Sequence, residues 1–246
     1  FSSSPLWVSA LIDYDGWQNA WRYLGAAVFL FSILAFFLYK DSPESYGLVP
    51  DGFKNDKTGS GTSKKAARQY TLKEAKKTRA FWMYGLALAF NSFFITGLTF
   101  HIVSIFENEG FPKEDAISIF LPASIVAVTI SSIFNFLSDY IALQLYLYLL
   151  LLGGILSSFG FLFLSSPIGV PFLIAGFGIM GGFFAVLNAV AWPRFYGRTH
   201  LGSITGKVMS FLILASALAP SIFSLSLSTF GTYHLVGYLG LAFLVF

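Results

Sequence analysis

Neutral polar side chains inside long apolar segments are the residues of this chain best suited to contact a solute. They lie near the middle of three such segments and are Asn91, Ser92, Thr96, Ser124, Thr129 and Ser216. A polar group in apolar surroundings is unfavourable unless it bonds to a neighbour or faces a water-filled cavity. We therefore expect these side chains to line a substrate cavity, with Asn91 as the best candidate. For Asn91 the alternative is a hydrogen bond between helices without contact to the substrate.

His101 is an ionisable side chain within these segments. It lies about 12 Å from the middle of its segment, counted from Phe93 at about 1.5 Å per residue. Because a histidine gains or loses a proton near neutral pH, His101 is a candidate for binding a coupling proton or for a gate. The alternative is a structural histidine that is hydrogen-bonded near the membrane surface.

Motifs of enzymes and metal sites are missing from the sequence. The chain contains no cysteine, which excludes disulfides, thiol catalysis and cysteine-ligated metals. It contains neither His-Glu-x-x-His nor Gly-x-Ser-Gly, and no pair of acids lies in the middle of an apolar segment. We expect no enzyme activity, no cofactor and no metal ion.

Composition and hydropathy place the candidate residues in a membrane. Hydrophobic residues make up 56% and charged residues 11% of the 246 residues, whereas a soluble domain has about 25% charged residues. A helix needs about 20 apolar residues to cross a bilayer. The segments that meet or approach this length are 17–39, 80–106, 116–138, 141–164, 171–192 and 207–228. With a further span that begins near His234, they predict an all-α membrane protein.

The distribution of basic residues predicts the orientation of these spans. Segment 40–79 holds ten of the fifteen Lys and Arg residues, and Arg194, Arg198 and Lys207 lie in a later loop on the same side. Such loops stay in the cytoplasm. We predict a multi-pass protein of the cell (inner) membrane whose central loop, 40–79, is cytoplasmic.

The central loop separates two parts of the chain, 1–39 and 80–246. Within the loop, Thr71 and Glu74 match a capping box, which predicts a basic helix that runs into Phe81.

A shift of 215 residues lays segment 5–31 on segment 220–246 with eight identities, among them Gly16 with Gly231. This match indicates two duplicated halves. Because Phe1 is not Met and Phe246 lies in an apolar run, we expect both ends to be truncated.

Several strings are typical of bacterial members of one transporter family. They are Gly16-Trp17-Gln18, 41–52 (DSPESYGLVPDG), 71–82 (TLKEAKKTRAFW) and 195–206 (FYGRTHLGSITG). With the basic central loop and the duplication, they resemble the major facilitator superfamily (MFS), and within it the monocarboxylate-transporter and oxalate/formate-antiporter subgroup. The resemblance implies that residues 1–39 are the end of the fifth helix and the sixth helix. It implies that residues 80–246 run from the seventh helix through most of the twelfth. It also implies an inner-gate role for Asp139, which stands where the family has a motif acid; an acid that merely ends a helix is the alternative.

The resemblance implies a secondary active transporter that works by alternating access. Its substrate is expected to be a small organic solute, such as a monocarboxylate, moved with a coupling proton. The spans lack the buried Arg or Lys that carboxylate carriers often use, so an exporter of a neutral or cationic compound is one alternative. A non-transporting sensor or scaffold on the same fold is another. The expected partners are the solute and the lipid bilayer, with no nucleic acid, and we expect a monomer.

Overall fold

The computed structural model describes residues 4–38 and 69–245, so most of the predicted central loop lies outside the described residues. The chain divides into two compact units: one holds residues 6–66, and the other holds residues 1–5 and 67–246. Six of the described helices are long and apolar enough to cross a membrane. This confirms the prediction of an all-helical membrane protein.

Helix α1 (Ser4–Leu38) consists of two helical segments that meet at Gly16. The φ angle of Gly16 is 79°, in the left-handed region that a residue without a Cβ adopts readily. Near this bend, the Tyr23 hydroxyl donates to Oδ2 of Asp15 at 2.5 Å. Gly231, which the 215-residue shift matches to Gly16, also has a positive φ, of 69°, at the end of α8 (Leu201–Phe230). Both matched segments thus contain a helix break at a glycine with a positive φ.

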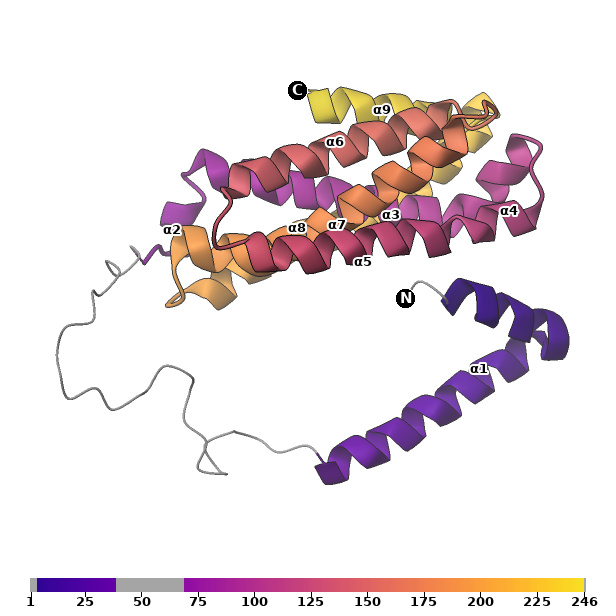
Figure 1. Cartoon of the computed structure of the whole chain (residues 1–246), viewed down its shortest axis with the longest axis horizontal. Coiled ribbons are helices and arrows are strands. Elements are labelled where there is room, and N and C mark those ends of the chain that lie inside the picture. Colours follow the sequence, from indigo (N-terminus) through magenta and orange to yellow (C-terminus); the bar gives the residue numbers. More distant parts are fainter. Residues whose placement is uncertain (1–3, 39–68, 246) are drawn as a thin grey trace. The chain divides into compact units, whose positions relative to one another are not determined.

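The remaining helices form a bundle whose long members lie side by side (Figure 1). The long helices are α3 (Arg79–Asn108), α5 (Phe120–Leu137), α6 (Leu143–Leu162), α7 (Gly169–Tyr196) and α8. The shorter ones are α2 (Leu72–Ala75), α4 (Lys113–Ser118) and α9 (His234–Val245). The bounds of the long helices agree with the predicted spans to within a few residues, except at the start of α8.

Two local predictions at helix starts are wrong in part. The capping box forms, because the Thr71 N–H donates to Glu74 Oε2 at 2.8 Å and Thr71 Oγ1 accepts the Glu74 N–H. The helix nevertheless ends at Ala75, because Thr78 caps a new helix, α3, by accepting the Phe81 N–H at 3.3 Å. Lys207 lies inside α8, which begins at Leu201, and its Nζ lies 5.0 Å from the centre of the Phe211 ring. A long lysine side chain allows this helix to begin earlier than the charge pattern suggested.

Glycines allow α6 and α7 to pack closely. A Cβ atom at Gly176 of α7 would lie 2.6 Å from the carbonyl oxygen of Gly153 on α6, and one at Gly153 would lie 2.7 Å from the backbone nitrogen of Met180. Both distances are shorter than real Cβ contacts. The backbones approach closely because small residues stand at their contact, as is common where helices pack within a bilayer.

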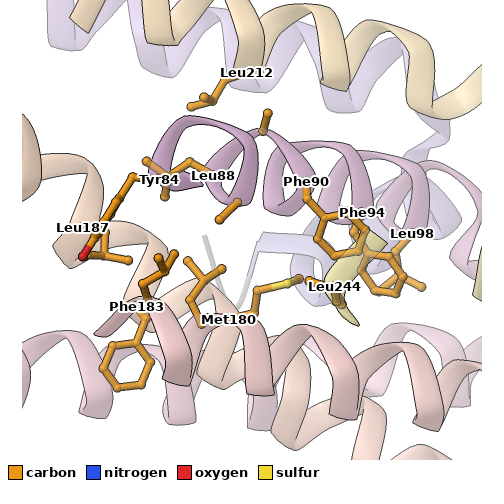
Figure 2. Close-up of a cluster of buried hydrophobic side chains, with 14 of the residues drawn as sticks. Tyr84, Leu88, Phe90, Phe94, Leu98, Met180, Phe183, Leu187, Leu212 and Leu244 are labelled. Carbon is orange, nitrogen blue, oxygen red and sulfur yellow. The ribbon is translucent and has the colours of Figure 1, made fainter. Parts of the chain in front are cut away.

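Apolar side chains fill the space between α3 and α7 (Figure 2). From α3, Leu88 and Phe94 are fully buried, and from α7 so are Met180 and Leu187. Leu212 of α8 and Leu244 of α9 complete this cluster. It forms the core of the bundle, around which the polar residues are arranged.

The two ends of the bundle carry different charges. We call the end with α2 and the α7–α8 turn the basic end, and the end with the α3–α4 and α8–α9 turns the acidic end.

At the basic end, Oε1 of Gln69 accepts the backbone N–H groups of Arg198 and Thr199 at 2.9 and 3.0 Å. The Tyr70 N–H donates to the carbonyl oxygen of Tyr196 at 3.0 Å. The last residues before α2 are therefore held on the α7–α8 turn.

Candidate functional site

Three of the predicted cavity residues meet along the contact between α3 and α8. Oγ1 of Thr96 lies 2.8 Å from Oγ of Ser216, within hydrogen-bond distance. One turn away, the Ser92 hydroxyl donates to the carbonyl oxygen of Leu212 at 3.1 Å. All three side chains are half-buried. In this structure their hydrogen bonds join two helices.

Ser124 lies at a separate hollow of about 170 Å³ between α3, α5 and α7. Its lining is mostly apolar, with Ile95, Phe120, Ala123, Ala127, Phe177 and Gly181 beside the hydroxyl groups of Thr99 and Ser124. The Ser124 hydroxyl donates to the Leu121 carbonyl oxygen at 2.7 Å. Its oxygen lone pairs stay available to accept hydrogen bonds. A small, mainly apolar hollow with two hydroxyl groups suits part of a small organic molecule.

Gly178 and Gly182 bring α5 and α7 together beside this hollow. A Cβ at Gly178 would lie 2.6 Å from the Ala123 carbonyl oxygen, and one at Gly182 would lie 2.8 Å from the Ile130 side chain. At Gly181 the nearest atom to a Cβ is the Ala127 Cβ, at 3.8 Å. Gly178 and Gly182 therefore set the helix spacing, whereas Gly181 leaves space open.

Asn91 and Thr129 lie elsewhere. Asn91 is 1% exposed within α3, and its Oδ1 has no hydrogen-bond partner among the described residues. Thr129 is exposed on α5, and its hydroxyl donates to the Ile125 carbonyl oxygen at 2.8 Å. Neither residue lines the hollow at Ser124.

A second, more polar hollow of about 570 Å³ lies between α3 and α8 toward the acidic end. It is lined by Phe100, His101, Pro220, Ser221, Ser224, Leu225 and Ser228. The three serines are exposed and follow one another on the same face of α8, because residues three or four apart are neighbours on a helix. Within this hollow, Nε2 of His101 lies 3.2 Å from the Pro220 carbonyl oxygen, and Nδ1 lies 3.3 Å from the Tyr233 hydroxyl.

Asp139 lies at the basic end, exposed in the turn between α5 and α6. It makes no ion pair within residues 4–38 and 69–245 of the structure. The adjacent residue, Ser138, accepts a hydrogen bond from the Arg194 guanidinium through its backbone carbonyl oxygen. The α5–α6 turn is therefore attached to the end of α7 through the backbone of Ser138. The carboxylate of Asp139 takes no part in this attachment.

Several residues at the two hollows were missed by sequence reasoning. They are Thr99, Ser221, Ser224, Ser228 and Tyr233. The spacing of the three serines on α8 is a signal that could have found them, because it places them on one face of an apolar helix. For Tyr233 there is no such signal, since it lies in a short turn between two helices.

The described residues contain no group of three or more His, Cys, Asp or Glu side chains that could hold a metal ion. The helices around both hollows carry no Asp, Glu, Lys or Arg in their central turns. The chemistry available there is hydrogen bonding by hydroxyl groups, apolar contact and, at His101, proton binding. These groups can hold a solute by hydrogen bonds and apolar contacts.

Comparison with known proteins agrees with this geometry. No curated protein matches the chain. The family model described as Major Facilitator Superfamily matches residues 2–220, which include α1 and α3 through most of α8. The match covers most of the 246 residues, and it includes every residue that lines the hollow at Ser124. The chain belongs to the Major Facilitator Superfamily.

Proposed function

We propose that this chain is part of a secondary active transporter that moves a small organic solute across the membrane by alternating access. Major facilitator proteins are secondary transporters assembled from repeated halves, so the chain is a transporter and not an enzyme. The single observation that carries the proposal beyond the family is the hollow at Ser124. Three spans of the bundle meet there around two hydroxyl groups and no charge.

A monocarboxylate is the substrate class we propose. The resemblance to the monocarboxylate and oxalate/formate subgroup supports this class, as does the size of the hollow, about 170 Å³. An anion in a site without a fixed positive charge is unfavourable. A coupling proton balances this charge, so we propose that the solute moves together with a proton.

An exporter of a neutral compound is the second candidate. It is favoured by one observation, the absence of Asp, Glu, Lys and Arg from the central turns of the helices that line the hollows. A neutral solute needs no charged partner there. The two candidates differ in whether the charge of the solute matters, and this can be measured.

Uptake by the whole protein in proteoliposomes tests the proposal. Labelled lactate and its uncharged analogue lactamide have nearly the same size, so the pair isolates the effect of the carboxylate. We expect lactate to accumulate when an inward proton gradient is applied, and a protonophore to abolish the accumulation. Equal movement of lactamide, indifferent to the gradient, would favour the neutral solute. Binding of lactate without flux would identify a sensor.

The orientation of the chain is testable because it contains no cysteine. We propose that the basic end lies in the cytoplasm of a cell whose inner membrane holds the protein. Single cysteines at Thr199 and at Lys113, both exposed, report on the two ends. In intact cells, a membrane-impermeant maleimide is expected to label Lys113→Cys and to label Thr199→Cys only after permeabilisation. The reverse pattern would contradict the orientation.

A further inference from the structure

His101 takes part in a chain of polar contacts that links α3 to α8 and to the α8–α9 turn. Its Nε2 lies 3.2 Å from the carbonyl oxygen of Pro220, and its Nδ1 lies 3.3 Å from the hydroxyl of Tyr233. The same hydroxyl lies 2.9 Å from Oγ of Ser104. The imidazole ring stacks on Phe223, with ring centres 5.8 Å apart and an angle of 11° between the planes. Both nitrogens of the ring are therefore engaged.

Counting donors and acceptors shows which form of the ring these contacts fit. A carbonyl oxygen only accepts, so Nε2 of His101 carries the hydrogen that it gives to Pro220. The Tyr233 hydroxyl donates its one hydrogen to Oγ of Ser104, so its oxygen faces Nδ1 as an acceptor. Nδ1 can bond to this oxygen when it also carries a hydrogen, and the ring is then a charged imidazolium.

We propose that His101, Tyr233 and Ser104 form a proton-binding relay. One proton from hydronium is bound at Nδ1 of His101, where an N–H bond forms and a water molecule is released, and no bond of Tyr233 or Ser104 breaks. The new N–H donates to the Tyr233 oxygen, whose own hydrogen already points to Ser104. The relay thus gives the charged ring an acceptor at both nitrogens, which offsets the main obstacle to charging a group in a membrane.

The surroundings of His101 give a proton a route and no competing charge. The hollow of about 570 Å³, with three exposed serines of α8, leads to the ring. Tyr233 is the only ionisable side chain among its contacts in the described part of the chain. The next ionisable groups lie apart from the ring. Toward the acidic end they are Glu107 in the last turn of α3, His234, which is paired with Glu109 at 3.4 Å, and Lys113, Glu114 and Asp115 of α4. At the basic end they are Lys207, Arg194 and the tyrosines of α6 and α7.

The contact with Pro220 connects the bound proton to the shape of α8. Proline has no N–H, so the backbone hydrogen bond that residue 220 would otherwise make to the carbonyl of Ser216 is missing, and the helix can bend there. A charged imidazolium donates a stronger hydrogen bond than a neutral ring. Proton binding therefore tightens the contact between α3 and α8 at the proline. As a coupling step, this rests on the proposed transport function; as proton binding, it does not.

Nuclear magnetic resonance of the purified whole protein, with nitrogen-labelled histidine and carbon-labelled tyrosine, tests the relay without any substrate. The chain has three histidines, so replacing each by glutamine in turn assigns its signal. At high pH we expect His101 in the form with hydrogen on Nε2. On acidification from about pH 9 to about pH 4, we expect Nδ1 to gain a proton and the Tyr233 signal to move with the same midpoint.

The matched control is His234→Gln, which removes the other histidine at the acidic end. This variant is expected to leave the joint titration of His101 and Tyr233 unchanged. Hydrogen on Nδ1 at high pH, a His101 that stays neutral throughout, or a Tyr233 signal that does not follow His101 would each overturn the relay. These readings hold whether or not the protein transports a solute, so they separate failure of the relay from failure of the proposed function.

Lactate flux then tests the coupling. His101→Gln keeps an N–H that can reach the Pro220 carbonyl but cannot bind a proton. We expect lactate accumulation driven by a proton gradient to fall at least about tenfold in His101→Gln. His234→Gln is expected to accumulate lactate normally. Normal gradient-driven accumulation in His101→Gln would overturn the coupling role.

Discussion

Replacing Gly176 by valine is expected to prevent the bundle from packing. A Cβ at this position would lie 2.6 Å from the Gly153 carbonyl oxygen and closer still to the backbone nitrogen of Ser157. These are backbone atoms of α6, so relief requires the two helices to separate along the contact that holds α6 to α7. We expect the free energy of unfolding to fall by about 3 kcal/mol or more. Thermal unfolding of the purified protein in detergent, followed by size-exclusion chromatography, measures the loss.

Gly202→Val is the matched control for this prediction. Gly202 also lies in a helix, but nothing in the described part of the chain lies within 4 Å of a Cβ built there. The same change of residue should therefore leave the unfolding temperature close to that of the unaltered protein. If both variants unfold at the same temperature, the close contact between α6 and α7 does not determine stability.

Replacing Gly181 by leucine is expected to stop transport while the fold is kept. A Cβ at Gly181 meets only the Ala127 Cβ, at 3.8 Å, so the backbone does not have to move. The rest of the leucine side chain would enter the hollow of about 170 Å³ that also contains Ser124. We expect lactate uptake to fall at least about tenfold, equivalent to about 1.4 kcal/mol, with an unchanged unfolding temperature.

Two alanine variants separate filling of the hollow from damage to the helix contact. Gly181→Ala adds one methyl group where there is space and should retain uptake and stability. Gly178→Ala, one turn away on the same helix, places its Cβ 2.6 Å from the Ala123 carbonyl oxygen and should lower stability. Uptake at the normal rate by a folded Gly181→Leu protein would show that the solute does not pass through this hollow.

The glycines of α7 show how a local pattern can indicate packing without assigning individual roles. Their helical spacing suggests close approach to another helix. The structure shows that Gly176 contacts α6, that Gly178 and Gly182 contact α5, and that Gly181 faces the hollow. These roles differ because each glycine points in a different direction around the helix. Which helix lies in each direction is a property of the folded bundle.

The candidate site residues were chosen by type, and the structure shows which contacts each of them makes. Ser124 does line a hollow, and His101 does lie near the acidic end with partners on both ring nitrogens. Thr96 and Ser216, chosen independently as cavity residues, bond to each other instead. Asn91 is fully enclosed, away from the hollow at Ser124. Residue type indicates that a side chain needs a polar partner, and it does not indicate whether the partner is water or a neighbouring helix.

The sequence by itself determined the helical membrane class, the approximate span bounds and the absence of charge in the central turns, because each depends on the hydropathy of adjacent residues. Only the tertiary structure decided the partners of Thr96, the contacts of the α7 glycines and the contact of His101 with Tyr233. These depend on how far each helix is rotated about its axis, which close packing with distant segments sets. Thr96 and Ser216 are 120 residues apart. No local pattern encodes a contact between residues so distant.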